Sequence, residues 1–403
     1  MGCRTVVQLT IGEKKYSDRM IKHFANRYGW VERTLPLRMM ASISLAGWCL
    51  SGGTTTAIAS VFLYHPPQTI VQPLLAFAEP PQAEAVSFQL AREQFVEQTA
   101  ARFGLDPAAI RTALNSAVFQ PSIVMAMQHP AEKVKTWAEY RGLFLTPTRI
   151  RGGQEFLRAN AALLTKIEHQ SGVPAEIITA IIGVETLYGA NTGHYRVLDA
   201  LYTLAFGYPV RSEPEFKDVD TQRAMYFRDE LAQFFALCRE EHLPLTELKG
   251  SYAGAIGMGQ FMPSSYRALA KDGNRDGRRN LLTNTADIVA SISNYLTTKG
   301  GWKSGGPIAV PATLGPGHPP IESENLTAMY KLSELSARGY HVLAPVTKGV
   351  LATPVTLHNP DTDEYWLGFQ NFYAITSYNH SPQYAMAVFQ LAQAIKVQAE
   401  KSP

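Results

Sequence analysis

The sequence predicts a mostly helical α+β protein in which a small strand-bearing segment interrupts a helical body. Apolar residues recur at helical spacing in several stretches between residues 84 and 241 and again in residues 382–398. After Trp302 the chain becomes rich in glycine and proline and contains two short strand-like runs. With 46% hydrophobic and 18% charged residues among 403, the composition is that of a globular protein with a sizeable core.

The N-terminal segment, residues 1–78, predicts export. Its first 40 residues hold eight Lys or Arg against three Asp or Glu, whereas residues 39–78 contain none of these four types. A basic flank before a charge-free apolar run is typical of a signal peptide or a membrane anchor. Residues 39–64 are long enough to cross the ~30 Å hydrocarbon core, and Ala-Phe-Ala at 76–78 offers a cleavage site. The prediction is therefore an exported, periplasmic or cell-envelope protein, with cleaved signal and retained inner-membrane anchor both open.

The charge balance and the cysteines exclude two classes of partner. Beyond residue 40 the chain has 29 basic and 31 acidic residues, so the body offers no basic surface for nucleic acid. Of the three cysteines, only Cys238 lies in the body. One thiol makes neither an internal disulfide nor a zinc site, and we expect Cys238 to be a small buried side chain.

The elements of the body follow in order. Residues 84–150 predict a helical domain, in which Asp106 and Pro107 supply the N-cap and first position of one helix. Periodicity at 154–170, 174–188 and 224–241 predicts the helices of a core at residues 151–302. Residues 303–370 predict a β-containing insertion with two strands joined by a turn at 359–363. Residues 371–381 return the chain to the core, and the helix at 382–398 is expected to join the first domain.

One glutamate stands in an otherwise apolar helix, in the stretch IIGVETLYG. Helical spacing places Glu185 on the same face as Ile178, Ile181 and Ile182. Burial there would disfavour the charged form and raise the pKa of Glu185, as a general acid at a glycosidic oxygen requires. A structural glutamate paired with an arginine or a hydroxyl fits the same pattern. Glu176, half a turn away, is expected to be a solvated first-turn residue.

Two later segments carry side chains that suit a sugar site. Residues 249–273 contain several glycines, which permit tight turns, together with Ser251 and Gln260. Residues 371–389 place Asn379 among tyrosines, including Tyr378 and Tyr384, whose rings suit sugar faces. A structural loop and ordinary core packing are the alternatives for these segments taken singly.

A third segment resembles the first half of an EF-hand calcium loop. Its D-x-N-x-D-G spacing supplies Asp272, Asn274 and Asp276 before Gly277. The twelfth position is a threonine instead of an acid, and Asp287 is the nearest later carboxylate. We predict a structural Ca²⁺ site on these three side chains and Asp287, with a solvated turn as the alternative; the chemistry itself requires no cofactor.

These segments, in this order, resemble the membrane-bound lytic murein transglycosylase B family. The matching stretches lie within residues 88–398: IIGVETLYG, LDALYTLAF, LKGSYAGAIGMGQFMPSSY, NLLTNTADI with SNYL, and NFYAITSYNHSPQYAMAV. The resemblance implies a lysozyme-like catalytic core flanked by a helical domain and a small β domain. It also implies cleavage of the β-1,4 bond between N-acetylmuramic acid and N-acetylglucosamine in peptidoglycan strands without water, which closes a 1,6-anhydro ring.

The same resemblance assigns roles to single residues. Glu185 is the implied catalytic acid and then base. The implied substrate-binding side chains are Tyr140, Arg223, Ser251, Gln260, Tyr295, Tyr378, Asn379 and Tyr384. An insertion interrupts the family's Tyr-Pro-Arg-Arg stretch, so the arginine of the cleft is Arg211 or Arg223, and we favour Arg223.

One carboxyl group suffices for this chemistry, whereas an ordinary glycosidase needs two. Asp199 is the obvious second carboxylate, yet we expect it to be the N-cap of the next helix. The alternative functions are a hydrolytic muramidase on the same fold and a non-catalytic peptidoglycan-binding envelope protein. The sequence indicates no protein partner.

Overall fold

The computed structural model describes residues 82–128, 135–211, 213–322, 326–347 and 349–399. The predicted export segment, residues 1–78, lies outside these residues. The contacts below belong to the unit Leu90–Pro403. Among the residues described, no helix combines the length and apolar character needed to cross a bilayer.

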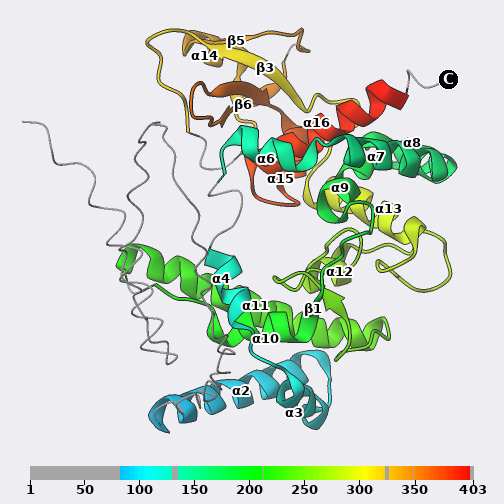
Figure 1. Ribbon diagram of the computed structural model, residues 1–403, viewed down its shortest axis with the longest axis vertical. Coiled ribbons are helices and arrows are strands. Elements are labelled where there is room, and N and C mark those ends of the chain that lie inside the picture. The colour runs from blue at the N-terminus through cyan, green and yellow to red at the C-terminus, as the bar shows by residue number, and fades with distance from the viewer. Residues whose placement is uncertain (1–81, 129–134, 212, 323–325, 348, 400–403) are drawn as a thin grey trace, which may run out of the picture. The chain divides into compact units, whose positions relative to one another are not determined.

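The first described part of the chain is helical, as predicted (Figure 1). Its helices are α2 (Gln82–Phe103), α3 (Pro107–Ser116), α4 (Pro121–Gln128), α6 (Trp137–Phe144) and α7 (Pro147–Ala159). Asp106 caps α3 by accepting a hydrogen bond from the backbone N–H of Ala108 at 2.9 Å, which confirms the predicted N-cap. Thr136 and Glu139 form a reciprocal capping box at the start of α6.

The helix that carries Glu185 lies at the centre of the next group. That group consists of α8 (Ala161–Ser171), α9 (Ala175–Thr186), α10 (Val197–Gly207), α11 (Pro214–Glu240), α12 (Pro263–Leu269), α13 (Thr285–Asn294) and the π-helix η1 (Tyr295–Lys299). Helix α9 is buried on nearly all sides and packs against α7, α8, α13 and α16 (Figure 1). A helix that is apolar all round belongs inside a core, which explains its position.

Two helix predictions need correction. Helix α10 begins after Arg196, so Asp199 lies inside its first turn and the predicted N-cap is wrong. Helix α10 begins this early because β1 (Tyr195–Arg196) pairs with β2 (Lys249–Gly250) and ends directly before the helix, at Arg196. The helix predicted at 224–241 begins ten residues earlier, at Pro214, because the inserted segment continues α11.

The strand-bearing segment forms a five-stranded antiparallel sheet in the order β4-β6-β7-β3-β5. Its strands are β3 (Ala309–Leu314), β4 (Tyr330–Lys331), β5 (Tyr340–Val342), β6 (Leu351–Leu357) and β7 (Glu364–Gly368), with α14 (Leu332–Ala337) between β4 and β5. Strands β6 and β7 form the predicted hairpin, in which Leu357 pairs with Glu364. The mostly helical α+β fold is confirmed.

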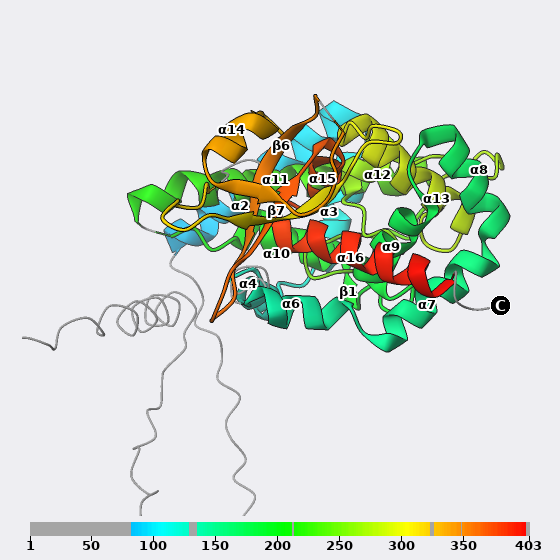
Figure 2. The same cartoon turned by 90° about the horizontal axis from the view of Figure 1, so that it is seen from above.

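The last two helices return the chain from the sheet to the core (Figure 2). These are α15 (Gln370–Thr376) and α16 (Pro382–Ala399), and α16 packs against α6, α7, α9 and α15. Lys396 on α16 forms an ion pair with Glu176 on α9 at 2.9 Å, so Glu176 is paired and only 18% exposed instead of solvated. Cys238 is buried as predicted, and burial raises the pKa of its thiol to about 12.

Candidate active site

Glu185 lies half-buried in the last turn of α9, where a tyrosine from α16 reaches it. The hydroxyl of Tyr384 donates a hydrogen bond to Oε1 of Glu185 at 2.7 Å, although 199 residues separate the two. Tyr384 is only 2% exposed. Burial, reinforced by the charge of Glu185, raises the pKa of Tyr384 well above its usual value. Tyr384 therefore stays protonated and remains a donor to the carboxylate.

The end of α9 is fixed to the glycine-rich loop by Thr186. Its hydroxyl donates to the carbonyl oxygen of Met258 at 2.9 Å and accepts from the backbone N–H of Gly189 at 3.0 Å. Thr186 is 1% exposed, so these bonds satisfy a buried polar group. Thr186 is not among the predicted site residues; the signal for it in the sequence is a second polar side chain directly after Glu185 in an apolar helix.

Arg149 on α7 also contacts the last turn of α9. Its Nε donates to the carbonyl oxygen of Gly183 at 2.8 Å, and its own carbonyl accepts from the hydroxyl of Tyr188 at 2.7 Å. Burial lowers the pKa of Arg149. A Cβ on Gly183 would lie 2.5 Å from the Tyr188 hydroxyl, so any larger residue at this position would clash with the tyrosine side chain.

The predicted residues of the glycine-rich loop act within the loop itself. Gln260 donates through Nε2 to the carbonyl oxygens of Gly257 and Thr192, at 2.9 and 3.2 Å. The hydroxyl oxygen of Ser251 accepts from the backbone N–H groups of Ala253 and Ala255. Both side chains therefore stabilise the loop, and their binding of substrate stays a prediction.

Three more of the predicted tyrosines gather near Glu185. Tyr378 donates to the carbonyl oxygen of Gly259 at 2.5 Å, and burial and then the charge of Glu185 raise the pKa of its hydroxyl. The ring of Tyr295 lies 4.6 Å from that of Tyr378. Tyr140 is buried close enough to Tyr384 to contribute, as the last of several causes, to the raised pKa of Tyr384. Asn379 follows Tyr378 and is half-buried.

The two candidate arginines differ in what they contact. Arg211 forms a two-pronged ion pair with Asp220, at 2.7 and 3.0 Å, and stacks on the ring of Phe216. Arg223 is exposed on α11 and donates to the hydroxyl of Tyr208 at 3.3 Å. Of these two arginines, Arg223 is thus the one that forms no ion pair within the part of the chain that the structure describes.

Two other buried carboxylates are engaged in structural contacts. Asp199 accepts from the backbone N–H of Val118 at 2.9 Å and lies 3.5 Å from the guanidinium of Arg196. Glu230, which was not predicted from the sequence, accepts from the backbone N–H and hydroxyl of Ser264, and burial raises its pKa. Fixed donors therefore satisfy both of these carboxylates.

The predicted calcium loop brings its three side chains together. Asp272 accepts from the backbone N–H groups of residues 275–277, and Asn274 donates to Asp276 at 2.8 Å. Gly277 has φ +86°, the left-handed turn that position six of such a loop requires. Asp287 is buried, and its oxygens accept from three backbone N–H groups. It anchors the loop in this structure.

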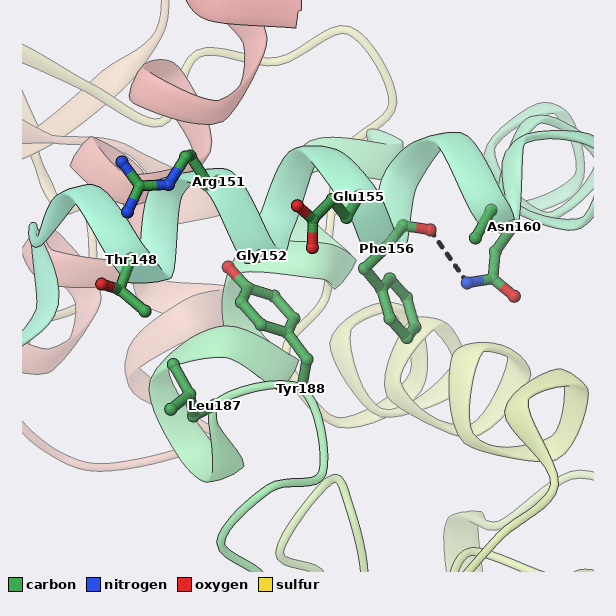
Figure 3. Close-up of a pocket in the computed structure, with 9 residues that line it drawn as sticks. Thr148, Arg151, Gly152, Glu155, Phe156, Asn160, Leu187 and Tyr188 are labelled. Carbon is green, nitrogen blue, oxygen red and sulfur yellow. Dashed lines mark hydrogen bonds between the residues drawn. The ribbon is translucent and has the colours of Figure 1, made fainter.

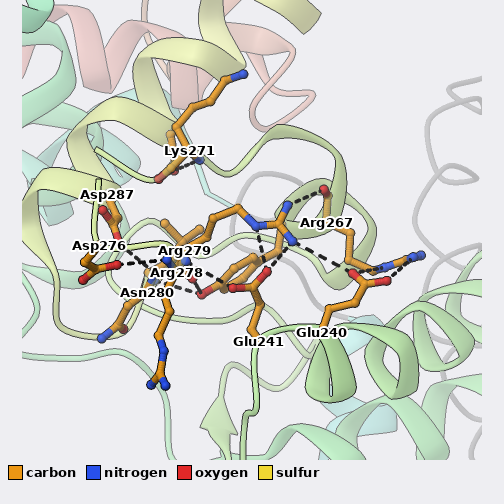
Figure 4. A network of polar contacts seen from close by, with 12 residues as sticks. Glu240, Glu241, Arg267, Lys271, Asp276, Arg278, Arg279, Asn280 and Asp287 are labelled. Atoms are coloured by element: carbon orange, nitrogen blue, oxygen red, sulfur yellow. Dashed lines mark hydrogen bonds and ion pairs between the residues drawn. The ribbon is translucent and has the colours of Figure 1, made fainter. Parts of the chain in front are cut away.

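The donor set fits the first half of a calcium site. An ionised carboxylate has about four acceptor sites, so the N–H bonds of Asp272 and Asp276 leave lone pairs for a cation. The described residues contain no cluster of three or more His, Cys, Asp or Glu suited to a metal. The predicted calcium loop includes Asn274 as its third side-chain oxygen donor. Figure 4 shows Arg279 turned away from the loop toward Glu241, with Nε–Oε1 at 2.7 Å.

Comparison with known proteins gives consistent matches. The family model described as Transglycosylase SLT domain matches residues 87–393. The chain is 36% identical over 351 residues to membrane-bound lytic murein transglycosylase B of Escherichia coli (strain K12), covering 85% of this chain and 90% of that protein.

Solved structures agree with these matches. Catenated lytic transglycosylase SltB1 from Pseudomonas aeruginosa is similar with a TM-score of 0.69 and 38% identity, over 77% of this chain and 98% of that chain. Escherichia coli Slt35 in complex with calcium gives 0.67 and 36%, over 77% and 93%. Pseudomonas aeruginosa SltB3, in complex with NAG-anhNAM-pentapeptide, gives 0.62 and 27%, over 77% and 79%.

Proposed function

Because the chain belongs to the membrane-bound lytic murein transglycosylase B family and is a lytic transglycosylase acting on peptidoglycan, we propose that Glu185 is its sole catalytic acid and base. The observation that carries this proposal is the 2.7 Å hydrogen bond from Tyr384 to Oε1 of Glu185, at the end of a buried helix. Asp199 and Glu230, by contrast, are engaged by structural donors.

In the first step, Glu185 acts as the acid. Its carboxyl proton passes to the glycosidic oxygen between N-acetylmuramic acid and N-acetylglucosamine, and the bond from that oxygen to C1 of the muramoyl sugar breaks. The proton leaves with the N-acetylglucosamine as its new hydroxyl. The resulting carboxylate keeps the hydrogen bond from Tyr384, which stabilises the ionised form.

In the second step, the same group acts as the base. The Glu185 carboxylate takes the proton of the 6-hydroxyl of the muramoyl sugar, and the oxygen bonds to C1 to close the 1,6-anhydro ring. The proton returns to Glu185, so no water is consumed and the enzyme is regenerated. No second carboxylate is needed, in contrast to a two-carboxylate hydrolase.

The surrounding side chains position the sugar. We assign the substrate-binding group as predicted: Tyr140, Arg223, Ser251, Gln260, Tyr295, Tyr378, Asn379 and Tyr384. Tyr378 is half-buried and exposed Arg223 offers a cation, whereas Tyr140, Tyr295 and Tyr384 are buried and would act by positioning their neighbours. Ser251 and Gln260 hold the loop that the sugar would contact.

The proposal is tested by digesting purified murein with wild type and with Glu185→Gln, followed by mass spectrometry of the fragments. Wild type is expected to release anhydro-muropeptides, and Glu185→Gln to lose at least about a hundredfold in rate, since general acid–base catalysis contributes 10²–10⁴-fold. Glu176→Gln, on the same helix, is the matched control and is expected to stay active. Wild-type rates from Glu185→Gln would refute the assignment, and reducing ends from wild type would favour the hydrolytic alternative.

Calcium binding is a second part of the proposal. Asp272, Asn274 and Asp276 would hold Ca²⁺ through side-chain oxygens, with Asp287 as the fourth predicted residue and as the loop's anchor. The support is the donor geometry of this loop and the similarity to Slt35, which was solved in complex with calcium. The ion would stabilise the loop and take no part in the chemistry.

Membrane attachment is the third part. We assign residues 39–64 as the signal or anchor, which would place the enzyme in the periplasm or cell envelope. The support is the charge pattern of the segment and the similarity to a relative named as membrane-bound. Cell fractionation tests it, because the full chain should sediment with membranes when the anchor is retained, and a chain starting at residue 79 should not.

A further inference from the structure

The two partners of the central hydrogen bond, Glu185 and Tyr384, are supported by different parts of the fold. On the side of the acid, Tyr188 follows Glu185 by three residues and lines a cavity of about 510 Å³ on the face of α7 (Figure 3). Its hydroxyl donates to the carbonyl of Arg149 at 2.7 Å, so the end of α9 is attached to α7. Tyr384 is the third residue of α16, so its support must come from the segments that contact the start of that helix.

The start of α16 is bonded to the segment that leads into α6. Gln383, directly before Tyr384, donates through Nε2 to the carbonyl of Lys135 at 3.3 Å. Two turns further along α16, Oε1 of Gln390 accepts a hydrogen bond from Nε of Arg141 at 2.6 Å. Both bonds join α16 to α6 or to the residues just before it. The position of Tyr384 therefore depends on the position of α6.

The β-sheet supplies the next support, because the β6–β7 hairpin caps the start of α6. The carbonyl of His358 accepts from the backbone N–H of Trp137 at 2.8 Å. Oδ1 of Asn359 accepts from the backbone N–H of Ala138, also at 2.8 Å. The first N–H groups of a helix have no partner within the helix, and an Asn side chain is well suited to satisfy them. Here the cap comes from a residue 221 positions further along the chain.

Asn359 is itself held in place by the turn of the hairpin. Oδ1 of Asp363 accepts from the backbone N–H of Asn359 at 3.3 Å and lies 3.2 Å from Nδ1 of His358. Asn359 is half-buried, whereas Asp361 and Thr362 in the same turn are exposed. The turn predicted at 359–363 therefore does more than join two strands, because it presents a fixed amide oxygen to α6.

We propose that Asn359 is a positioning residue for catalysis: by capping α6 it holds the start of α16, and with it the hydroxyl of Tyr384 on Glu185. The inference rests on the proposed function, which makes that hydrogen bond important. The path runs from the Asn359 amide to α6, from the carbonyl of Lys135 to Gln383, and from there to the next residue, Tyr384. The β insertion thus takes part in the reaction, although it supplies none of the predicted substrate-binding residues.

The test measures kcat and KM on soluble murein fragments for Asn359→Ala and Asn359→Asp. Asn359→Ala removes the acceptor for the N–H of Ala138 and is expected to lower kcat by about three- to tenfold, with KM unchanged. Asn359→Asp keeps an oxygen acceptor at the start of α6, where a negative charge is also favourable, and should restore kcat to within about twofold of wild type. In a Tyr384→Phe enzyme, Asn359→Ala should lower kcat no further, because both changes remove the same contribution.

Asp106→Ala is the matched control, because it removes the same kind of bond from the N–H of Ala108 at the start of α3. It should lower the unfolding temperature as Asn359→Ala does and leave kcat as in wild type. Asn359→Ser, whose shorter side chain reaches α6 less well, is the second variant should Asn359→Ala unfold, and it should lower kcat in the same direction.

Three results would overturn the inference: a wild-type kcat from Asn359→Ala, an equal loss of kcat from Asp106→Ala, or the same loss from Asn359→Ala with and without the Tyr384 hydroxyl. An active Glu185→Gln enzyme would refute the catalytic assignment alone. The coupling between Asn359 and Tyr384 is measured without reference to the group that supplies the proton, so the two failures are distinguishable.

Discussion

The hydrogen bond from Tyr384 to Glu185 is the contact that distinguishes this glutamate from a merely buried acid. A carboxylate inside an apolar helix has few donors, and the hydroxyl that reaches it stays protonated because burial raises the pKa of Tyr384. This donor stabilises the ionised form of the carboxylate.

Removing this donor should change how activity depends on pH. In Tyr384→Phe the ionised carboxylate loses a hydrogen bond, so the protonated acid persists to higher pH. We expect the alkaline limb of kcat/KM to move upward by about one pH unit, and kcat to fall by about tenfold.

The measurement is a pH–rate profile on soluble murein fragments, with Tyr373→Phe as the control on α15. If the alkaline limb of Tyr384→Phe coincides with that of wild type, Tyr384 does not act on Glu185. A matching loss in Tyr373→Phe would mean that any tyrosine in this region affects folding.

Sequence periodicity located Glu185 but could not have found its neighbours. Helical spacing relates residues within one element, so it predicted the apolar face of α9. Tyr384 lies 199 residues further on, and only the resemblance to a known family connected the two. Thr186 and Arg149 were not predicted, because each donates to a backbone carbonyl of another segment. Such a contact does not depend on the side chain of the partner and therefore leaves no signal in the sequence.

At the level of elements, α9 is held at its functional end by packing against α7. The ring of Tyr188 passes between the two helices where Gly183 has no side chain. The Nε of Arg149 donates a hydrogen bond to the carbonyl of Gly183, and the carbonyl of Arg149 accepts one from the hydroxyl of Tyr188. The last turn, and with it Glu185, is fixed by contacts that contain no substrate-binding residue.

Filling this space should destabilise the protein and reduce its activity. In Gly183→Ala the new Cβ would lie 2.5 Å from the Tyr188 hydroxyl, so the ring must move and its bond to Arg149 must break. We expect a loss of about 1–3 kcal/mol in the free energy of unfolding, as for other overpacked cores, together with a lower kcat.

The comparison is with Gly142→Ala on α6, where a Cβ would meet nothing within 4 Å. Thermal unfolding of both variants measures the difference. Equal unfolding midpoints for Gly183→Ala and Gly142→Ala would show that the structure accommodates the new Cβ at no cost in stability. The packing at Gly183 would then not fix the last turn of α9.

The boundaries of helices and strands were predicted correctly where residues adjacent in sequence determine them. They were missed where pairing between distant segments determines them. The cap of α3 and the hairpin of β6 and β7 depend on adjacent residues, and both were predicted. The start of α10 depends on pairing between β1 and β2, which lie 53 residues apart at their closest, counting from Arg196 to Lys249. Strands β3, β4 and β5 lie among glycine and proline residues and show no alternating pattern.

At the scale of the whole molecule, the calcium loop links two helices of the core. Arg279 pairs with Glu241 beyond the end of α11, and Asp287 in α13 receives N–H groups from within the loop. An ion bound here would therefore stabilise the attachment of the loop to α11 and to α13.

Calcium should accordingly raise the unfolding temperature. At a free concentration of a hundred times its dissociation constant, a ligand adds about 2.7 kcal/mol to stability, which corresponds to a rise of several degrees. We expect this rise in wild type with Ca²⁺ added after chelation, and none in Asp272→Asn/Asp276→Asn.

Differential scanning calorimetry makes the measurement, with Asp361→Asn, an exposed acid outside the loop, as the control. Mg²⁺ should have a smaller effect because it demands stricter geometry. An identical calcium shift in the loop variant and in wild type would place the ion elsewhere.

The predicted division into domains at residues 150, 302 and 370 remains a prediction. Helix α16 contacts α6, α7 and α9 alike, so one closing helix serves both the first helical part and the core. The glycine- and proline-rich composition after Trp302 coincides with the segment that holds β3 to β7. The helix at 382–398 was expected to join the first helical part, and its contacts with α7 and α9 were not predicted.

The hydrogen bond between Glu185 and Tyr384 also has a consequence for folding. It joins residues 199 positions apart, so it can form only once α16 has packed against α9. A folding intermediate in which α16 is still undocked would hold the acid without its donor.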